Sequence, residues 1–167
     1  ENNEPLNILI SNTTNPNCNG TNTGSIQASV VGGTPNYTVL WSNGANQLTL
    51  SNLKAGNYQV TVTDGNGTRV SASAALEEPT AIVLEDIVQD ASCNGENNGS
   101  IQIFSSGGTP TYKYQWANGV RQASNLNLPN GDYSVTVTDG NNCTTSKNYT
   151  VLEPNPIELS FSSNNFS

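Results

Sequence analysis

The chain contains no histidine, and this limits the chemistry that its side chains could perform. Serine and cysteine hydrolases activate their nucleophile with a neighbouring base, most often a histidine. A pair of carboxylates could hydrolyse a glycosidic bond without one. Most Asp and Glu residues, however, fall in predicted turns and at domain boundaries rather than at strand ends that face one cleft. We therefore expect no catalytic residues and no enzyme activity.

The acidic residues could instead bind calcium, a cation that takes several oxygen ligands. One candidate place is a pair of equivalent turns, where Asp64 lies near Asn66 and Asp139 near Asn141; the alternative there is an ordinary turn. The other candidate place is the interval between the two halves of the chain, where the alternative is a solvated acidic linker. The four carboxylates of that interval belong to Glu77, Glu78, Glu85 and Asp86. Calcium is the one cofactor that the sequence suggests.

Charge and hydropathy exclude two classes of partner. The chain has 167 residues with only five Lys and Arg against 13 Asp and Glu, so its net charge is −8. Nucleic acids and anionic membrane surfaces are bound by clustered basic residues, which this chain lacks. No apolar run approaches the roughly 20 residues that span a bilayer. Because the chain opens at Glu1 without a signal-peptide pattern, we expect a mature or excised segment.

The sequence repeats itself with a fixed period. Cys-Asn-Gly occurs at positions 18–20 and again at 93–95, so the offset between the two copies is 93 − 18 = 75. Residues 24–64 and 99–139 align without a gap and share 22 identities in 41 positions. The chain is therefore a tandem duplication, and a unit of this length is large enough to hold its own small core.

A Glu-Pro dipeptide followed by alternating Ile and Leu marks each boundary, at residues 4–5, 78–79 and 153–154. We predict one domain over residues 1–78, a second over 79–153, and the first strand of a truncated third repeat over 154–167. The linker between the first two is short, contains a proline and has no Gly-Ser run. We therefore expect the domains to sit end to end with limited swing.

Each unit reads as a series of short strands separated by turns. A Gly-Gly-Thr-Pro turn precedes a strand that ends in a tryptophan, and an Asn-Gly turn follows it. Residues 58–64 alternate between apolar and polar side chains, as do residues 133–139. Six or seven such strands predict an all-β fold, with an antiparallel immunoglobulin-like sandwich in each unit.

Two aromatic residues of each unit are predicted to anchor its core. Trp41 and Trp116 end the strand after the Gly-Gly-Thr-Pro turn, and Tyr58 and Tyr133 follow a Leu and a Gly at the spacing of a tyrosine corner. The alternative for each tryptophan is a solvent-exposed platform on which a sugar ring stacks. Exposure of the two indoles decides between these interpretations.

The ordered motifs resemble the SprB-type repeats of Bacteroidota cell-surface and gliding adhesins. The resemblance rests on Cys-Asn-Gly, Gly-Gly-Thr-Pro-x-Tyr, Trp-x-Asn-Gly, Leu-x-x-Gly-x-Tyr and Val-Thr-Val-Thr-Asp-Gly, and it covers both units almost entirely. It implies immunoglobulin-like modules that serve cell adhesion outside the cell and are exported by type IX secretion. It transfers no active site.

The same family pattern carries two cysteines per repeat, which in the second unit are Cys93 and Cys143. The resemblance implies a disulfide between them, closing a loop of about 50 residues that would contribute roughly 4 kcal/mol in the chain-entropy model. The first unit departs from the pattern because Thr68 replaces the second cysteine (143 − 75 = 68). Cys18 is therefore expected to be unpaired, either as an inert thiol or as an intermolecular link. Disulfides indicate an oxidising, extracellular setting.

Two functions from different classes remain open. In the first, the segment is a non-catalytic, rod-like stalk or spacer of a long adhesin or filament, and its partners are the neighbouring repeats. In the second, it is a carbohydrate-binding module whose exposed aromatic residues recognise surface glycans. Other surface proteins are a further candidate class of partner. Phe104 is the best exposed aromatic candidate for the second function, but its counterpart is Ser29 (104 − 75 = 29), so no aromatic platform repeats.

Overall fold

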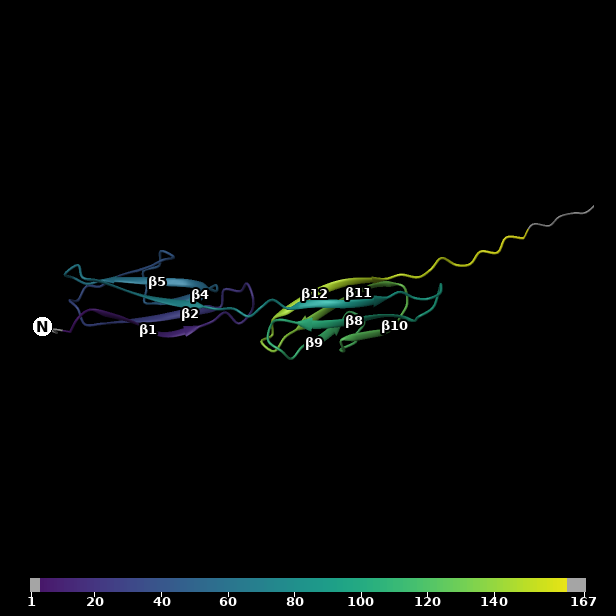
Figure 1. Ribbon diagram of the computed structural model, residues 1–167, viewed down its shortest axis with the longest axis horizontal. Coiled ribbons are helices and arrows are strands. Elements are labelled where there is room, and N and C mark those ends of the chain that lie inside the picture. The colour runs from purple at the N-terminus through teal and green to yellow at the C-terminus, as the bar shows by residue number, and fades with distance from the viewer. Residues whose placement is uncertain (1–3, 162–167) are drawn as a thin grey trace, which may run out of the picture. The chain divides into compact units, whose positions relative to one another are not determined.

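The structure is a computed structural model that describes residues 4–161, and within them the chain forms strands, turns and loops without any helix. It divides into two compact units between Ala81 and Ile82 (Figure 1). The division falls three residues after the boundary that the Glu-Pro dipeptide predicted, because residues 79–81 continue from the first unit. No helix able to cross a membrane occurs in the part of the chain described.

The first unit is built from two antiparallel sheets of three strands. One sheet has the order β1-β2-β4 and the other the order β3-β5-β6. The strands are β1 (Asn7–Thr14), β2 (Gly24–Val31), β3 (Thr38–Trp41), β4 (Thr49–Leu53), β5 (Gly56–Thr63) and β6 (Arg69–Leu76). The chain crosses between the sheets three times, in the loops β2–β3, β3–β4 and β4–β5, and the inner faces of the two sheets enclose one core.

The second unit repeats this architecture, with sheets in the order β10-β8-β7 and β12-β11-β9. Its strands are β7 (Val83–Gln89), β8 (Gly99–Ser106), β9 (Lys113–Trp116), β10 (Ser124–Leu128), β11 (Gly131–Thr138) and β12 (Thr144–Val151). The predicted all-β class and the two immunoglobulin-like sandwiches are thereby confirmed.

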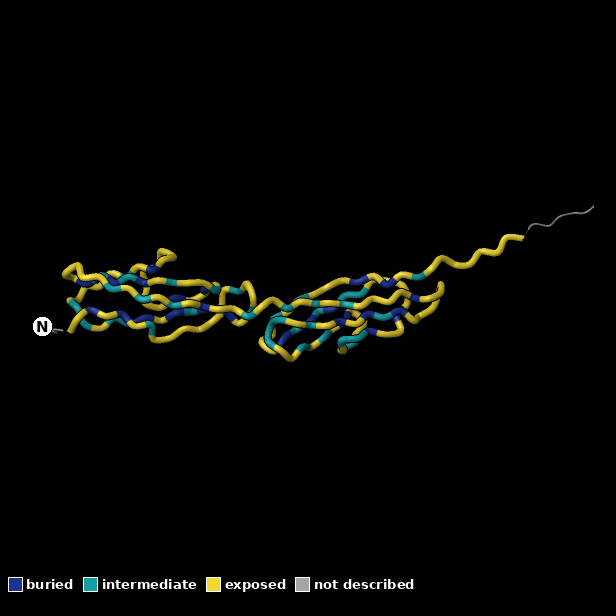
Figure 2. Tube along the Cα trace, viewed as in Figure 1, coloured by how far each residue is buried: buried dark blue, intermediate teal, exposed yellow. Residues whose placement is uncertain are grey.

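The strands form where the sequence alternates, because successive side chains of a strand point to opposite faces of its sheet. In β5, Val60 and Val62 are buried, while Thr61 and Thr63, which alternate with them, are partly exposed. The buried positions recur along the inner faces of both units (Figure 2). Each unit therefore has a hydrophobic core of its own.

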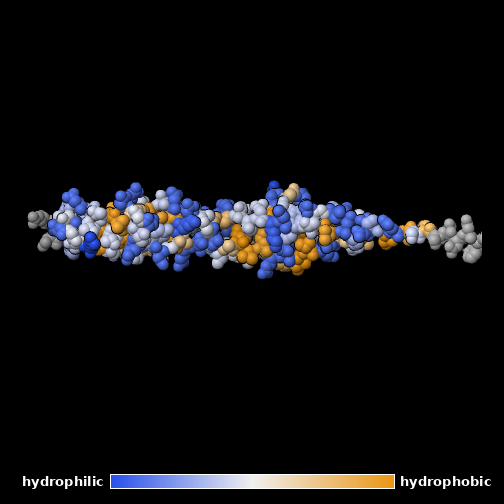
Figure 3. Space-filling model, turned by 90° about the horizontal axis from the view of Figure 1, so that it is seen from above, coloured by the Kyte–Doolittle hydropathy of each residue, from blue (hydrophilic) through white to orange (hydrophobic). Residues whose placement is uncertain are grey.

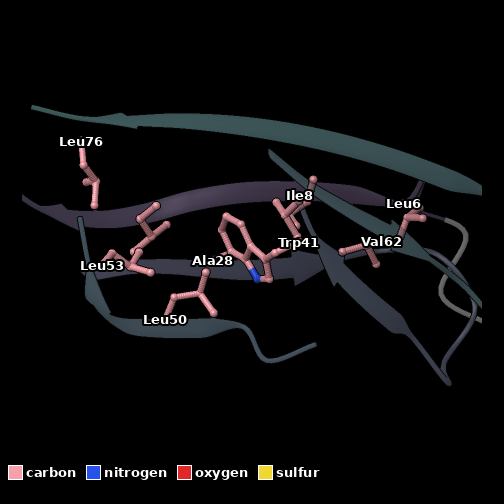
Figure 4. Packing of buried hydrophobic residues seen from close by; sticks show 10 residues of the cluster. Leu6, Ile8, Ala28, Trp41, Leu50, Leu53, Val62 and Leu76 are labelled. Carbon is pink, nitrogen blue, oxygen red and sulfur yellow. The ribbon is translucent and has the colours of Figure 1, made fainter. Parts of the chain in front are cut away.

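Trp41 lies in the middle of the first core, among the aliphatic side chains of both sheets (Figure 4). Only 2% of Trp41 and 1% of Trp116 is exposed. The Trp41 Nε1–H group donates to the Gln47 carbonyl at 2.7 Å, and Trp116 donates to the Gln122 carbonyl at 2.9 Å. Burial of the indole is thus achieved with its one polar group satisfied, as buried tryptophans require. Neither indole can serve as a sugar-stacking platform.

The predicted tyrosine corner is present in both units. The Tyr58 hydroxyl donates to the Lys54 carbonyl at 3.0 Å, and the Tyr133 hydroxyl donates to the Pro129 carbonyl at 2.9 Å. Both rings are half-buried and pack against the core of their unit. The bond spans four residues of backbone and fixes the loop that enters β5 or β11.

The constant period of the repeat fails in the first strand of each unit. Ile10 pairs with Ala28, whereas Asp86 pairs with Ile103, the equivalent of Ala28 (28 + 75 = 103). Asp86 therefore takes the place of Ile10, although the constant period would assign that place to residue 85 (10 + 75 = 85). The difference of one residue arises because β1 contains a bulge between Ile10 and Asn12. A bulge inserts one extra residue into a strand without disturbing the rest of the sheet.

The tail after the second unit forms no strand over residues 154–161, and residues 162–167 lie outside the described part of the chain. Ile157, Leu159 and Phe161 alternate as a strand of a third repeat would, yet they are 92%, 78% and 92% exposed. Their apolar faces contact no sheet that could cover them. The first strand of a third repeat stays a prediction.

One core position differs between the units in a way that can be tested. Asn125 is fully buried and exchanges two side-chain hydrogen bonds with Asn118, at 3.1 and 3.3 Å. Its counterpart in the first unit is Leu50, a core residue (125 − 75 = 50). The second unit thus uses an amide pair where the first uses a leucine.

We expect Asn125→Ala to lower the free energy of unfolding of the second unit by about 2 kcal/mol, because it leaves a cavity and removes two hydrogen bonds. Asn125→Leu should recover at least the original stability, since Asn118 is exposed and can bond to water. Chemical denaturation of both variants measures the difference. Equal stability of the two variants would contradict this interpretation of the site.

Candidate functional site

The acidic residues that could have bound calcium do not form a cluster. No group of three or more His, Cys, Asp or Glu side chains that could hold a metal ion occurs among residues 4–161. Three of the six predicted calcium ligands, Asp64, Asp139 and Glu78, instead accept hydrogen bonds from backbone N–H groups of their own unit. The turn aspartates bond a turn to a hairpin, whereas Glu78 bonds a loop to the chain that leaves the unit.

Asp64 fastens the Gly-Gly-Thr-Pro turn to the hairpin between β5 and β6. Its Oδ2 atom accepts a hydrogen bond from the Thr34 N–H group at 3.1 Å. Its Oδ1 atom accepts from the N–H groups of Asn66 at 3.0 Å and Thr68 at 2.8 Å. Only 7% of the residue is exposed. A carboxylate with three backbone donors is occupied as an acceptor, so the aspartate serves as a structural bridge here.

Asp139 makes the same bridge in the second unit and is 2% exposed. It accepts hydrogen bonds at 2.9 Å from the N–H groups of Thr109, Asn141 and Cys143. The hydrogen bond from the turn threonine is the largest cause that lowers the pKa of each aspartate below 3.8, and burial opposes it in part. Charge-assisted bonds to backbone N–H groups favour the ionised carboxylate.

The bridge explains why the second glycine of each Gly-Gly-Thr-Pro turn is needed. Gly33 and Gly108 have φ of +69° and +60°, a region that favours glycine. A Cβ atom at Gly33 would also lie 3.1 Å from the Asp64 Oδ2 atom and 2.8 Å from a methyl group of Leu6. At Gly108 it would lie 2.6 Å from Asp139 Oδ2. Only glycine lets the turn approach the carboxylate closely.

Glu78 holds the chain as it leaves the first unit. Its two carboxylate oxygens accept hydrogen bonds from the Asn19 side-chain amide at 3.0 Å and from the Gly20 N–H group at 2.7 Å. The same Asn19 amide donates to the Pro79 carbonyl at 3.1 Å. We call this set the exit clamp. The Cys-Asn-Gly loop is thereby bonded to the Glu-Pro dipeptide that follows the last strand.

The second unit contains an exit clamp with nearly the same distances. Glu153 accepts from the Asn94 amide at 3.1 Å and from the Gly95 N–H group at 2.7 Å, and Asn94 also donates to the Pro154 carbonyl at 3.2 Å. Sequence analysis found both motifs but not the bond between them, because they lie about 60 residues apart. The sequence signal that could have indicated this bond is the presence of both Cys-Asn-Gly and Glu-Pro in each repeat.

The other predicted junction ligands have separate environments. The Glu77 side chain is exposed, and its backbone N–H group donates to the Asn15 side chain at 3.1 Å. Glu85 lies exposed on β7, opposite Phe104. Asp86 forms an ion pair with Lys147 of β12. Calcium binding stays a prediction, and these four residues do not supply a common set of ligands within either unit.

The expected pairing of the cysteines is wrong. Cys93 is a free, exposed thiol, whereas Cys143 and Cys18 are disulfide-bonded. Cys93 precedes the exit clamp of the second unit, while Cys143 bonds to Asp139 beside the Gly-Gly-Thr-Pro turn. The length of β8 separates these two ends by about 25 Å, far beyond the span of a disulfide. The expectation that Cys18 is unpaired is also wrong.

Exposed apolar side chains gather on the outer face of the β10-β8-β7 sheet (Figure 3). Phe104 is 47% exposed, as the sequence suggested, and Val83, Ile87 and Leu126 are 51%, 60% and 60% exposed. Ser29 replaces Phe104 in the first unit, where Leu9 and Val31 are exposed on the equivalent sheet, so the aromatic member of this surface belongs to the second unit alone.

A shallow hollow recurs at one place in both units. It lies next to the short strand β3 or β9, and each copy has a volume of about 470 Å³. In the first unit the lining residues are Ser42, Asn57, Tyr58, Gln59, Ser73, Ala74 and Ala75, and in the second they are Ala117, Asp132, Tyr133, Ser134, Asn148, Tyr149 and Thr150. Each lining position has its counterpart one period away along the chain. The hollow is therefore a property of the repeat.

The aspartate bridge predicts a pH dependence of stability. Because the folded pKa of Asp139 lies below its ordinary value of 3.8, the bridge stabilises the fold above that pH. The contribution is lost as the pH falls through 3.8 towards the folded pKa. Asp139→Asn should therefore lower the melting temperature at neutral pH and reduce its acid dependence, measured by calorimetry from neutral to strongly acidic conditions.

Glu96→Gln is the matched control for this measurement. Glu96 lies in the same unit and is exposed, and its replacement removes the same charge. The melting curve of this variant should follow the wild-type pH dependence. An Asp139→Asn variant with that same unchanged dependence would show that the bridge is not what the acid disrupts.

Several solved structures resemble the chain at low sequence identity and low TM-score. The chain resembles the N-terminal eight Ig domains of Down Syndrome Cell Adhesion Molecule at 14% identity and a TM-score of 0.44, covering 90% of this chain and 25% of that one. A structure that describes Dscam isoform specificity has 11% identity and a TM-score of 0.38, covering 78% of this chain and 41% of that one. A chimeric titin Z1Z2-Z1Z2 tandem has 15% identity and a TM-score of 0.33, covering 90% of this chain and 100% of that one. The chain thus spans less than half of the two Dscam chains, and these scores support no statement on function.

Sequence comparison finds one family profile that matches a segment of each unit. No curated protein sequence matches the chain. The profile of the SprB repeat matches residues 10–46 and residues 86–121, one segment in each unit. The matched segments contain the Cys-Asn-Gly loop, the Gly-Gly-Thr-Pro turn and the tryptophan of each unit. The resemblance drawn from the motifs is confirmed, since the SprB repeat profile matches one segment of each unit.

Proposed function

We propose that this segment is a non-catalytic spacer of a long surface adhesin, a rod-like stalk that serves cell-surface adhesion or gliding. The observation that carries the proposal is the exit clamp, which occurs in both units with the same donors and acceptors. A clamp at the end of every repeat has a purpose in an array, because it sets the path of the chain towards the next repeat.

The clamp leaves little free chain between the units. Leu76 ends β6, and the hydrogen bonds of Glu78 and of the Pro79 carbonyl hold the next residues against the first unit. Only Thr80 and Ala81 remain before the second unit begins at Ile82. A linker of two residues next to a proline gives less freedom than a Gly-Ser linker of ordinary length. We infer limited swing between successive repeats.

Extracellular export fits the chemistry of the chain. Two of its three cysteines are disulfide-bonded, and such bonds persist in oxidising compartments. The SprB repeat supports a place in a cell-surface protein. We propose secretion to the cell surface through the type IX system, with the neighbouring repeats of the chain as the main partners.

Solution scattering from concatemers of two, four and six units tests the spacer. We expect the maximum dimension to rise linearly with the number of units, because each clamp restricts the next linker. Glu78→Ala at every equivalent position should make the increase less than linear. The matched control is Glu77→Ala in each first unit together with Glu96→Ala in each second unit, where Leu152 stands in the place of Glu77; it removes the same number of charges from exposed side chains. Coiling of the wild-type concatemers to the same degree as the Glu78→Ala series would refute the proposal.

Carbohydrate binding is a second candidate, favoured by the hollow that recurs at Tyr58 and Tyr133. Tyrosine rings with nearby amide and hydroxyl groups suit neutral sugars, and a chain of net charge −8 does not favour anionic ones. Two-dimensional NMR with cello- and laminari-oligosaccharides should then shift amides 57–59 and 132–134 together. Shifts around Phe104 alone would move the site to the opposite sheet, and no shift at all would remove this candidate for these sugars.

A further inference from the structure

The ion pair of the second unit joins its first strand to its last. Asp86 lies on β7, in the β10-β8-β7 sheet, and Lys147 lies on β12, in the β12-β11-β9 sheet. Backbone hydrogen bonds do not connect these two strands, because they belong to different sheets. The Lys147 Nζ atom contacts the Asp86 Oδ1 atom directly. This side-chain pair therefore bridges the two sheets at the strands where the chain enters and leaves the unit.

Tyr149 holds both members of the pair. Its hydroxyl group lies 3.5 Å from the same Asp86 Oδ1 atom, and the Lys147 Nζ atom lies 5.3 Å from the centre of its ring. The ring itself packs against Trp116, with 5.9 Å between the ring centres. The exposed fractions of the Lys147 and Asp86 side chains are 43% and 23%. The carboxyl group and the amine are thus positioned by a side chain anchored in the core.

The first unit shows what the fold requires at these positions. Ile10 occupies the place of Asp86, while Ala72 and Ala74 occupy the places of Lys147 and Tyr149 (147 − 75 = 72, 149 − 75 = 74). All three first-unit residues are partly buried and pack against its core. The sandwich therefore forms without the polar group. The second unit has a carboxylate, an amine and a phenol where the first has three apolar side chains.

A surface ion pair alone contributes only about 0–1 kcal/mol and needs no phenol beside it. Well-oriented reacting groups within one molecule reach effective concentrations of roughly 10⁵–10⁸ M, so a folded protein that orients an amine against a carboxyl group favours a condensation that free molecules do not undergo. We propose that Lys147 and Asp86 condense into an amide, an isopeptide bond that joins β7 covalently to β12.

The reaction balances without an oxidant or a cofactor. Proton transfer from the Lys147 ammonium to the Asp86 carboxylate gives a neutral amine and a carboxylic acid. The Nζ atom attacks Asp86 Cγ, a C–N bond forms, and the bond from Cγ to the hydroxyl oxygen breaks. That hydroxyl leaves with one proton from Nζ as a water molecule, and the product is a secondary amide. The Tyr149 hydroxyl is placed to donate to the carbonyl oxygen as negative charge develops on it.

Tyr149 is suited to that donation because it keeps its proton. Burial and the nearby Asp86 charge raise the pKa of the phenol to about 12. The phenol therefore stays protonated near neutral pH and can donate a hydrogen bond. Tyr149 is a positioning and polarising residue, and its own bonds do not change in the reaction.

Intact-mass spectrometry of the denatured, reduced chain tests the proposal, which does not depend on the spacer function. We expect the mass to fall short of the sequence mass by one water molecule, and proteolysis to yield one branched peptide that contains both Asp86 and Lys147. Lys147→Arg retains the ion pair and should show the full mass. Asp86→Asn should lose ammonia instead of water and reach the same final mass as the wild type.

Tyr149→Phe separates the role of the phenol from the packing of the ring. It should fold with the same core, as judged by near-ultraviolet circular dichroism, and condense more slowly, leaving a fraction of chains at full mass. The full sequence mass in a fully folded wild-type sample, with Lys147 free to be cleaved by trypsin, would overturn the proposal and leave an ion pair. A bond to any residue other than Asp86 would overturn it equally.

Discussion

Carboxylates that accept hydrogen bonds from backbone N–H groups hold both ends of each sandwich, and the rest of the structure depends on them. At the end where β1 or β7 enters, an aspartate bridges the glycine-rich turn and the last hairpin. At the other end, a glutamate bonds the Cys-Asn-Gly loop to the departing chain. Between these bridges the tryptophan fills a small core. A unit with few charged residues thus uses its acidic groups to fix loops that have little hydrophobic contact.

This use of the acidic residues bears on function. The turn aspartates are occupied by three backbone donors each, and the exit glutamates by two donors, so the conspicuous carboxylates of the repeat already have structural roles. What repeats is the pair of bridges, the core and the direction of the departing chain. These are the features that an extended array needs from each of its modules. The amide proposed for the second unit would add a covalent tie between the first and last strands of that module.

The sequence predicted what depends on local pattern. Alternation located strands such as β5, the Leu-x-x-Gly-x-Tyr spacing located the corner at Tyr58, and burial of Trp41 followed from its place on an inner face. Contacts between distant segments could not be read in this way. Glu78 appeared to be one acidic linker residue among several. The pairing of Cys93 with Cys143, which the family resemblance implied, is wrong because the two cysteines lie at opposite ends of the sandwich. The bulge in β1 hid the exchange of Ile10 for Asp86 behind an otherwise constant period.

The central claim is that each repeat closes on a core of its own, so that repeats can be added in series. Amide hydrogen exchange of the intact chain carrying Trp116→Ala tests it most directly, because this change removes the largest side chain of one core only. We predict that protection falls in β8, β9, β11 and β12, while β2, β3, β5 and β6 keep their wild-type protection. Equal loss of protection around Trp41 would mean that the two cores unfold as one, and it would contradict the account.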